Sequence, residues 1–206
     1  RTVIYDPELT LSLPVALSVT SGINAIAHAA EGLYSVDGNP VMDLMAAEGI
    51  AALGRALPAI RADSADLEAR SHALYGAWRC GVVLGNVGMA LHHKLCHTLG
   101  GSFNLPHAQT HTIVLPHALA YNAQAAPGAM ERIARALGGA SAARSVFDLA
   151  RDNGAPVALR EIGMQANDLE RACDIALQNQ YPNPRPLERA AIRQLLQDAY
   201  EGVRPA

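Results

Sequence analysis

Histidines are the residues of this 206-residue chain whose number and spacing point most directly to chemistry. Imidazoles can act as general acids and bases, or they can bind a metal ion. Six of the eight histidines lie in one short stretch, at His92, His93, His97, His107, His111 and His117. Their density indicates a catalytic or metal-binding site rather than scattered surface residues.

Two pairs of polar residues are spaced four apart, which places each pair on one face of a helix. The pairs are Asn24 with His28, and His93 with His97. His92 lies about 100° around the helix from His93 and is expected to point elsewhere. Each pair therefore offers its side chains to a common cleft.

His107 is expected at the start of a further helix, after a turn at Gly100-Gly101. A helix N-terminus disfavours an imidazolium, so it suits a neutral imidazole or an anionic ligand. Three helices could then bring four imidazoles into one cleft. These are His28, His93, His97 and His107.

The remaining candidates have simpler interpretations. His72 and His117 are interpreted as ordinary polar residues of amphipathic helices. Lys94 is the only lysine of the chain and could attract an anion, but it lies off the His93/His97 face and equally fits a solvated surface. Cys96 also lies off that face and is interpreted as a packing residue rather than a nucleophile.

Glycine, proline and capping residues divide the chain into about eight helices, which predicts an all-α, bundle-like domain. Thr20-Ser21-Gly22 is expected to separate a short helix at 14–19 from the next one. Another helix is expected to end at Gly100-Gly101. The main helices are expected at 23–34, 41–57, 64–84, 89–99, 106–122, 141–153, 167–179 and 186–200, with a shorter one at 130–137.

Composition supports this architecture and excludes several classes of function. Hydrophobic residues make up 50% of the chain but aromatic residues only 4%, which favours close-packed helices. The net charge is -3 without a basic patch, and no apolar run is long enough to cross a bilayer, so neither nucleic acid nor membrane is an expected partner. Three cysteines without a CxxC motif are typical of a reduced, cytoplasmic protein. The sequence contains no GxGxxG, P-loop or GxSxG motif.

Two motifs in the correct order resemble the iron-containing (group III) alcohol dehydrogenase family, and the resemblance covers essentially the whole chain. Residues 21–31, SGINAIAHAAE, are similar to its first metal motif, Gly-x-Asp-Ala-x-x-His-x-x-Glu. Residues 88–107 are similar to its second signature, and the segments 115–117 and 183–185 are further landmarks. The resemblance implies the helical catalytic domain of the dehydroquinate synthase-like fold. It also implies that residues 1–206 form one domain, with 1–12 a strand or linker remnant of an N-terminal nucleotide-binding α/β domain that is absent here.

The family binds a divalent metal through one Asp and three His, and these ligands fall on Asn24, His28, His93 and His107. A neutral amide is a poor ligand, so Asn24 makes the site resemble the maleylacetate reductase branch, which is thought to work without metal. No metal is therefore expected. If one binds, Fe or Zn held by the three histidines is the alternative. His97 matches a residue at the nicotinamide end of the cofactor, whose remainder is bound by the absent domain.

The resemblance implies reduction of maleylacetate to 3-oxoadipate by NADH or NADPH, in the breakdown of aromatic and chloroaromatic compounds. His97 is the expected proton donor or relay, while Asn24, His28, His93 and His107 hold the dicarboxylate substrate and the three histidines share in catalysis. The expected partners are the N-terminal domain and a second copy of the chain in a homodimer, and the chain alone is expected to be inactive. The alternatives are a metal-dependent alcohol dehydrogenase and a non-catalytic helical domain for metal binding or protein interaction.

Overall fold

The computed structural model describes residues 2–206, and this range contains nine α-helices, three short 3-10 helices and no strand. The all-α expectation is therefore confirmed. The α-helices are α1 (Val15–Gly32), α2 (Pro40–Ala62), α3 (Leu67–Leu84), α4 (Leu91–Phe103), α5 (His107–Asn122), α6 (Pro127–Ala136), α7 (Ala142–Asp152), α8 (Leu169–Ala176) and α9 (Arg189–Glu201). The 3-10 helices are η1 (Glu8–Thr10), η2 (Leu159–Ile162) and η3 (Ala166–Asp168).

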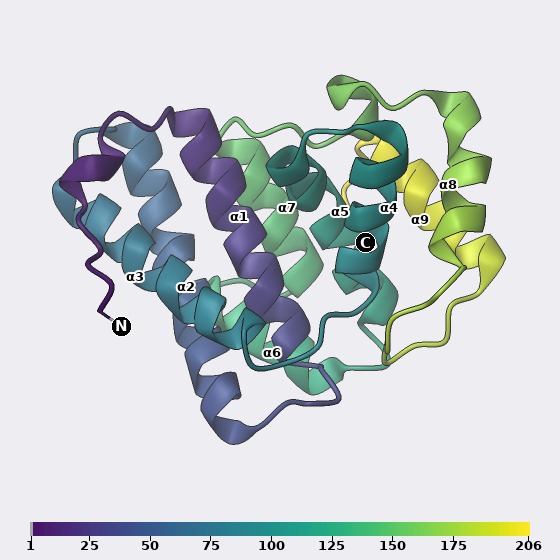
Figure 1. The fold of residues 1–206 in the computed structure, drawn as a ribbon, viewed down its shortest axis with the longest axis horizontal. Coiled ribbons are helices and arrows are strands. Elements are labelled where there is room, and N and C mark those ends of the chain that lie inside the picture. Colours follow the sequence, from purple (N-terminus) through teal and green to yellow (C-terminus); the bar gives the residue numbers. More distant parts are fainter. Residues whose placement is uncertain (1) are drawn as a thin grey trace.

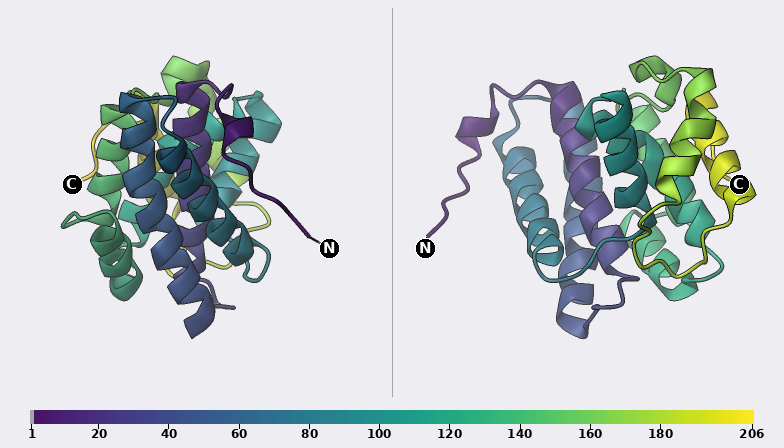
Figure 2. Two further views of the ribbon diagram at one scale, coloured as in Figure 1. Left: turned by 90° about the vertical axis from the view of Figure 1, so that its left-hand side faces the viewer. Right: turned by 45° about the vertical axis from the view of Figure 1, so that its right-hand side comes forward.

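Helices α1 and α5 form the centre of the molecule and the others pack around them. At one end, α2 and α3 pack against each other and against α1 (Figure 1). At the opposite end, α8 and α9 pack beside α4 and α5, as the turned views also show (Figure 2). Helix α5 contacts α1, α4, α7 and α9, so it joins the two ends.

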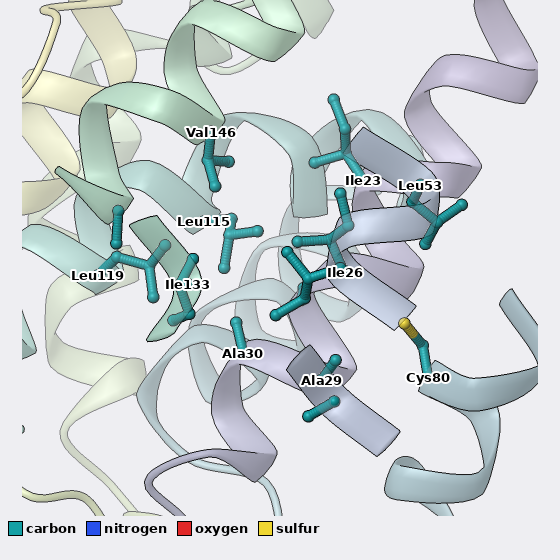
Figure 3. Packing of buried hydrophobic residues seen from close by; sticks show 14 of the residues in the cluster. Ile23, Ile26, Ala29, Ala30, Leu53, Cys80, Leu115, Leu119, Ile133 and Val146 are labelled. Atoms are coloured by element: carbon teal, nitrogen blue, oxygen red, sulfur yellow. The ribbon is translucent and has the colours of Figure 1, made fainter. Parts of the chain in front are cut away.

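Two hydrophobic cores fill these ends. The first combines α1, α2, α3, α6 and α7, and includes Ile23 and Ile26 of α1 packed near Leu115 of α5 (Figure 3). The second combines α4, α5, α8 and α9, and includes Ile113 and Val114 of α5. Helix α5 therefore contributes side chains to both cores, and it is buried along nearly its whole length.

Helix α1 is continuous from Val15 to Gly32, so the expected break at residues 20–22 is wrong. Gly22 is not a helix breaker here but a point of close packing, because a Cβ at this position would lie 2.6 Å from Cδ2 of Leu57 in α2. Thr20 remains in the helix by donating its hydroxyl to the carbonyl of Ala16. One rigid helix therefore carries the whole first motif.

Helix α4 also runs further than expected, through Gly100-Gly101 to Phe103. It ends where Asn104 adopts a left-handed conformation with φ of 55°. Asn104 therefore terminates the helix, as Gly100-Gly101 had been expected to do. Pro58 lies inside α2, which extends to Ala62 rather than ending at residue 57. Tertiary packing overrides local helix-breaking signals at both places.

The segment 2–6 has no regular secondary structure, and its apolar side chains are exposed, with Ile4 86% accessible. Its assignment, within 1–12, to a strand or linker remnant stays a prediction, and Arg1 lies outside the described residues. Across residues 2–206, no helix combines the length and apolar character needed to cross a membrane.

Candidate functional site

Helices α1, α4 and α5 bring imidazoles together at the junction of the two cores. His28 of α1 stacks on His93 of α4 with ring centroids 5.0 Å apart. His111 of α5 lies 5.0 Å from His93 and 4.3 Å from His107, and His97 lies 6.0 Å from His93. The structure therefore places the four histidines singled out from the sequence in one cluster, with His111 at its centre.

Asn24 lies one helical turn before His28 on α1, as its spacing predicts. Its Oδ1 atom is buried and has no hydrogen-bond partner in the structure. Buried polar atoms are nearly always paired, so an unpaired acceptor in a cluster of imidazoles indicates a place for a ligand or water. Nε2 of His93 and both ring nitrogens of His111 are likewise buried and unpaired.

Glu31 is the only carboxylate among the fully buried side chains of residues 2–206. It reaches from α1 to the start of α4, where the backbone N–H groups of Ala90 and His92 donate to it at 2.8 and 2.7 Å. Nδ1 of His93 lies 2.7 Å from Oε2 of the same carboxylate. Ala90 has no side chain that could cap α4, so Glu31 caps this helix from another element.

His92 faces the back of the cluster and is fully buried. Its Nε2 lies 3.1 Å from the carbonyl oxygen of His111, and its Nδ1 lies 3.4 Å from Nδ1 of His93. A carbonyl oxygen only accepts, so Nε2 of His92 carries the hydrogen and its Nδ1 is left as an acceptor. The His92 ring centroid lies 5.0 Å from that of His93 and 4.8 Å from that of His111, so His92 belongs to the cluster and the expectation that it points elsewhere is wrong.

Burial lowers the pKa of several histidines of the cluster. Burial, with added repulsion from His93 and His107, lowers the pKa of His28 from 6.5 to about 4. Burial and the same two neighbours lower the pKa of His111 to about 2 and also lower that of His97. These three side chains are therefore uncharged at neutral pH, so they can offer hydrogen bonds but no standing positive charge.

A tyrosine completes the rim of the cluster. The hydroxyl of Tyr181 lies 3.0 Å from Nδ1 of His97. Tyr181 belongs to the connection 177–188 between α8 and α9, called the strap below. Asn183 of the strap exchanges two side-chain amide hydrogen bonds with Asn122 of α5, at 2.9 and 2.8 Å. Lys94 lies nearby, with Nζ 5.9 Å from the centre of the Tyr181 ring.

The four positions expected to bind a metal carry three histidines and one asparagine, and no carboxylate. In the part of the chain that the structure describes, one group of three side chains has ligand atoms within 4.8 Å of one another, namely His92, His93 and His111. Nε2 of His92 is engaged with the carbonyl of His111, and both oxygens of Glu31 already accept hydrogen bonds. His28, His93 and His107, the three expected ligands, do not converge to that extent, and Asn24 supplies no negative charge.

The other candidates lie outside the cluster. His72 is exposed. His117 is buried on α5 and burial lowers its pKa to about 4, but it faces a separate hollow of the surface lined by Tyr121 and Asp198. Burial and the nearby Glu31 carboxylate raise the pKa of the Cys96 thiol, which is consistent with the packing role expected for it.

Sequence reasoning missed three residues of the site. His111 follows His107 by four positions, so the spacing that selected the other pairs could have found it. Glu31 is the last residue of the motif at 21–31, so the motif contains it, but the sequence alone predicted no role for it in the site. Tyr181 lies far along the chain in an irregular segment, and no local pattern connects it to His97.

Comparison with known proteins gives a consistent result. The Fe-containing alcohol dehydrogenase family, C-terminal, matches residues 18–200. Over its whole length the chain is 66% identical to a maleylacetate reductase of Burkholderia cepacia and 63% identical to one of Pseudomonas sp. strain P51. It is also similar to the crystal structure of maleylacetate reductase from Agrobacterium tumefaciens, with a TM-score of 0.96 and 56% identity over 98% of this chain.

In each case the chain spans 58% of the relative's length. The matched part of these relatives has the same helical fold as residues 2–206, and the family match covers α1 to α9. The chain therefore belongs to the iron-containing alcohol dehydrogenase family, as its C-terminal helical domain.

Proposed function

We propose that this chain is the catalytic, substrate-binding half of a nicotinamide-dependent reductase that converts maleylacetate to 3-oxoadipate. The observation that carries the proposal is the cluster of imidazoles from α1, α4 and α5, in which Asn24 replaces the expected aspartate and the Glu31 carboxylate already accepts hydrogen bonds through both oxygens. A metal-dependent alcohol dehydrogenase uses its metal to polarise the carbonyl of its substrate. An enone conjugated to carboxylates is already activated, so hydrogen-bonding imidazoles suffice.

The substrate-holding residues are Asn24, His28, His93 and His107. The Oδ1 atom of Asn24, the Nε2 atom of His93 and both ring nitrogens of His111 are buried and unpaired. The His28 ring lies beside that of His93, and the His107 ring lies beside that of His111. The bound dicarboxylate can accept hydrogen bonds from the Asn24 amide and from the N–H groups of the His28 and His107 imidazoles. Lys94 lies at the rim of the cluster, near the Tyr181 ring. Its positive charge attracts the dianion.

His97 and Tyr181 move the proton. When the Tyr181 hydroxyl donates to Nδ1 of His97, the His97 proton is on Nε2, from which it can pass to the substrate carbon. The tyrosine proton then shifts to Nδ1, and solvent restores the tyrosine. A reduced nicotinamide, when bound, supplies the hydride that adds to the carbon–carbon double bond. Together they add one hydride and one proton across that bond.

NADH or NADPH is the proposed cofactor, with His97 at its nicotinamide end. Residues 2–206 contain no strand and no glycine-rich phosphate loop, so they do not fit the dinucleotide by themselves. We infer that an N-terminal nucleotide-binding half binds the rest of the cofactor. A cytoplasmic location and a homodimer complete the proposal.

The test uses the full-length protein that contains this chain. It is chelated exhaustively, its metal content is measured by emission spectroscopy, and NADH or NADPH oxidation is followed with maleylacetate. Full activity without metal supports the proposal. Activity that is lost with the metal and regained with Zn or Fe instead indicates a metal-dependent alcohol dehydrogenase with His28, His93 and His107 as ligands.

Two variants separate catalysis from folding. His97→Gln removes the proposed relay and should lower kcat by roughly 10²- to 10⁴-fold. His72→Gln changes an exposed histidine far from the cluster and should leave kcat unchanged. If the metal-free, full-length protein oxidises neither NADH nor NADPH with maleylacetate, the proposed reductase is wrong and a non-catalytic helical domain is favoured.

A further inference from the structure

Glu31 is the feature of the site that the proposed chemistry does not use. It is 0% exposed. It lies on α1, which also carries Asn24 and His28, and its side chain reaches α4, which carries His93. Burying a carboxylate is costly unless hydrogen bonds satisfy it. Oε2 accepts from the backbone N–H of Ala90, and Oε1 accepts from that of His92.

These donors define the hydrogen-bonding role of Glu31. Both oxygens face N–H groups at the N-terminal end of α4, where the helix dipole stabilises a negative charge. The backbone N–H of His93 adds a weaker contact at 3.4 Å, and the Tyr34 hydroxyl another at the same distance. Glu31 is therefore surrounded by donors and is an acceptor throughout.

The short contact to His93 then has only one arrangement of its proton. With a carboxylate oxygen 2.7 Å away, Nδ1 of His93 must carry the hydrogen and donate it. A neutral His93 then has a bare Nε2, and this atom is buried, unpaired and next to the His28 and His111 rings. The second nitrogen of His93 is therefore a hydrogen-bond acceptor.

We propose that Glu31 is a positioning residue that locks His93 in the Nδ1–H tautomer and so presents an acceptor, rather than a donor, to the substrate. This role rests on the proposed function, because it assigns to the site its specificity for a substrate group that can donate a hydrogen bond. An enol hydroxyl of the substrate, or a bound water, fits this acceptor, whereas a bare carboxylate oxygen does not.

Helix capping alone would also explain a buried Glu31, so the test must distinguish the two roles. Asp66 is a matched control, because its Oδ1 caps α3 by accepting from the N–H of Ala69 at 3.0 Å without touching a histidine. Asp66→Asn and Glu31→Gln make the same chemical change at two helix N-termini. Glu31→Asp keeps the charge with a shorter reach.

The first measurement is the protonation pattern of the His93 ring, by ¹⁵N NMR of the histidine side chains at pH 7.5. In the unmodified chain, hydrogen should be on Nδ1 and absent from Nε2. In Glu31→Gln one carboxylate oxygen becomes an amide N–H₂ group, which can only donate. When this group faces His93, Nδ1 must accept and the ring hydrogen moves to Nε2, so the Nε2–H tautomer should become populated. The opposite orientation places the amide N–H₂ against a backbone N–H and is disfavoured. Hydrogen on Nε2 in the unmodified chain, or an unchanged tautomer in Glu31→Gln, overturns the proposal.

The second measurement is turnover of maleylacetate by the full-length protein. Glu31→Gln should lower kcat roughly 10- to 100-fold, Glu31→Asp should recover part of it, and Asp66→Asn should leave it unchanged. An unchanged kcat in Glu31→Gln overturns the positioning role. If Glu31→Gln does not fold, two measurements still test the positioning role. Hydrogen on Nε2 in the NMR spectrum of the unmodified chain overturns it, and so does an unchanged kcat in Glu31→Asp. A locked tautomer in an unmodified protein without reductase activity refutes the proposed function but not the tautomer.

Discussion

Acidification should destabilise this protein through its buried histidines. The pKa values of His28 and His117 are about 4 in the folded chain and that of His111 is about 2, against 6.5 when unfolded. Burial is the largest cause in each case. Because the folded-state values are lowered, the unfolded chain binds protons more readily, so stability is fully present above pH 6.5 and falls as the pH falls towards 4.

The size of the effect follows from the shifts. At pH 5, which is still above the folded-state pKa values, each histidine costs about 2 kcal/mol, from about 1.4 kcal/mol per pH unit below 6.5. The three together cost about 6 kcal/mol, which is comparable to the total stability of a typical domain, roughly 5–15 kcal/mol. We therefore expect marginal stability or unfolding between pH 5 and 4.

Urea unfolding followed by circular dichroism at pH 7.5, 6 and 5 measures this loss. The variant His111→Asn removes one titrating group and should reduce the loss between pH 7.5 and 5 by about one third, or about 2 kcal/mol. His72→Asn, at an exposed position, should leave the pH dependence unchanged. A free energy of unfolding that is flat from pH 7.5 to 5 would refute the reasoning, as would an equal pH dependence in His111→Asn and the unmodified chain.

Three further predictions concern single positions. Tyr181→Phe removes the hydroxyl that contacts His97 at 3.0 Å, and in the full-length protein kcat with maleylacetate should fall at least 10-fold while the melting temperature hardly changes. Gly32→Ala places a Cβ 2.3 Å from Cγ1 of Val83, so urea unfolding should show a loss of about 1–3 kcal/mol, and an equally stable variant would contradict the packing. Asn24→Asp supplies a carboxylate where the neutral amide is a poor metal ligand. Zinc should therefore raise the melting temperature of this variant much more than that of the unmodified chain. Equal shifts would contradict the argument that Asn24 weakens metal binding.

The helical fold could be predicted because alanine-rich, amphipathic segments recur along the chain between strong turn signals. The boundaries could not, because glycine and proline act differently inside a packed domain. Gly22 and Gly100 both lie within helices. Position 22 is a glycine because a larger residue would collide with Leu57. A single sequence does not contain the identity of such a neighbour.

The candidate site was predictable to the extent that it is local. The four-residue spacing of Asn24 with His28, and of His93 with His97, placed these side chains correctly on their helices. What could not be predicted is contact over long sequence separations. Tyr181 meets His97 only because the strap is held against α5, and this contact depends on the complete fold.

Helix α5 has a consequence for folding cooperativity. Helix α5 supplies Leu115 to one core and Ile113 to the other. If either core unfolds, α5 loses the packing contacts on that side. The two cores should therefore melt as one unit in calorimetry, despite occupying opposite ends of the molecule. His107 and His111 lie on this shared helix, so the imidazole cluster should exist only while both cores are intact.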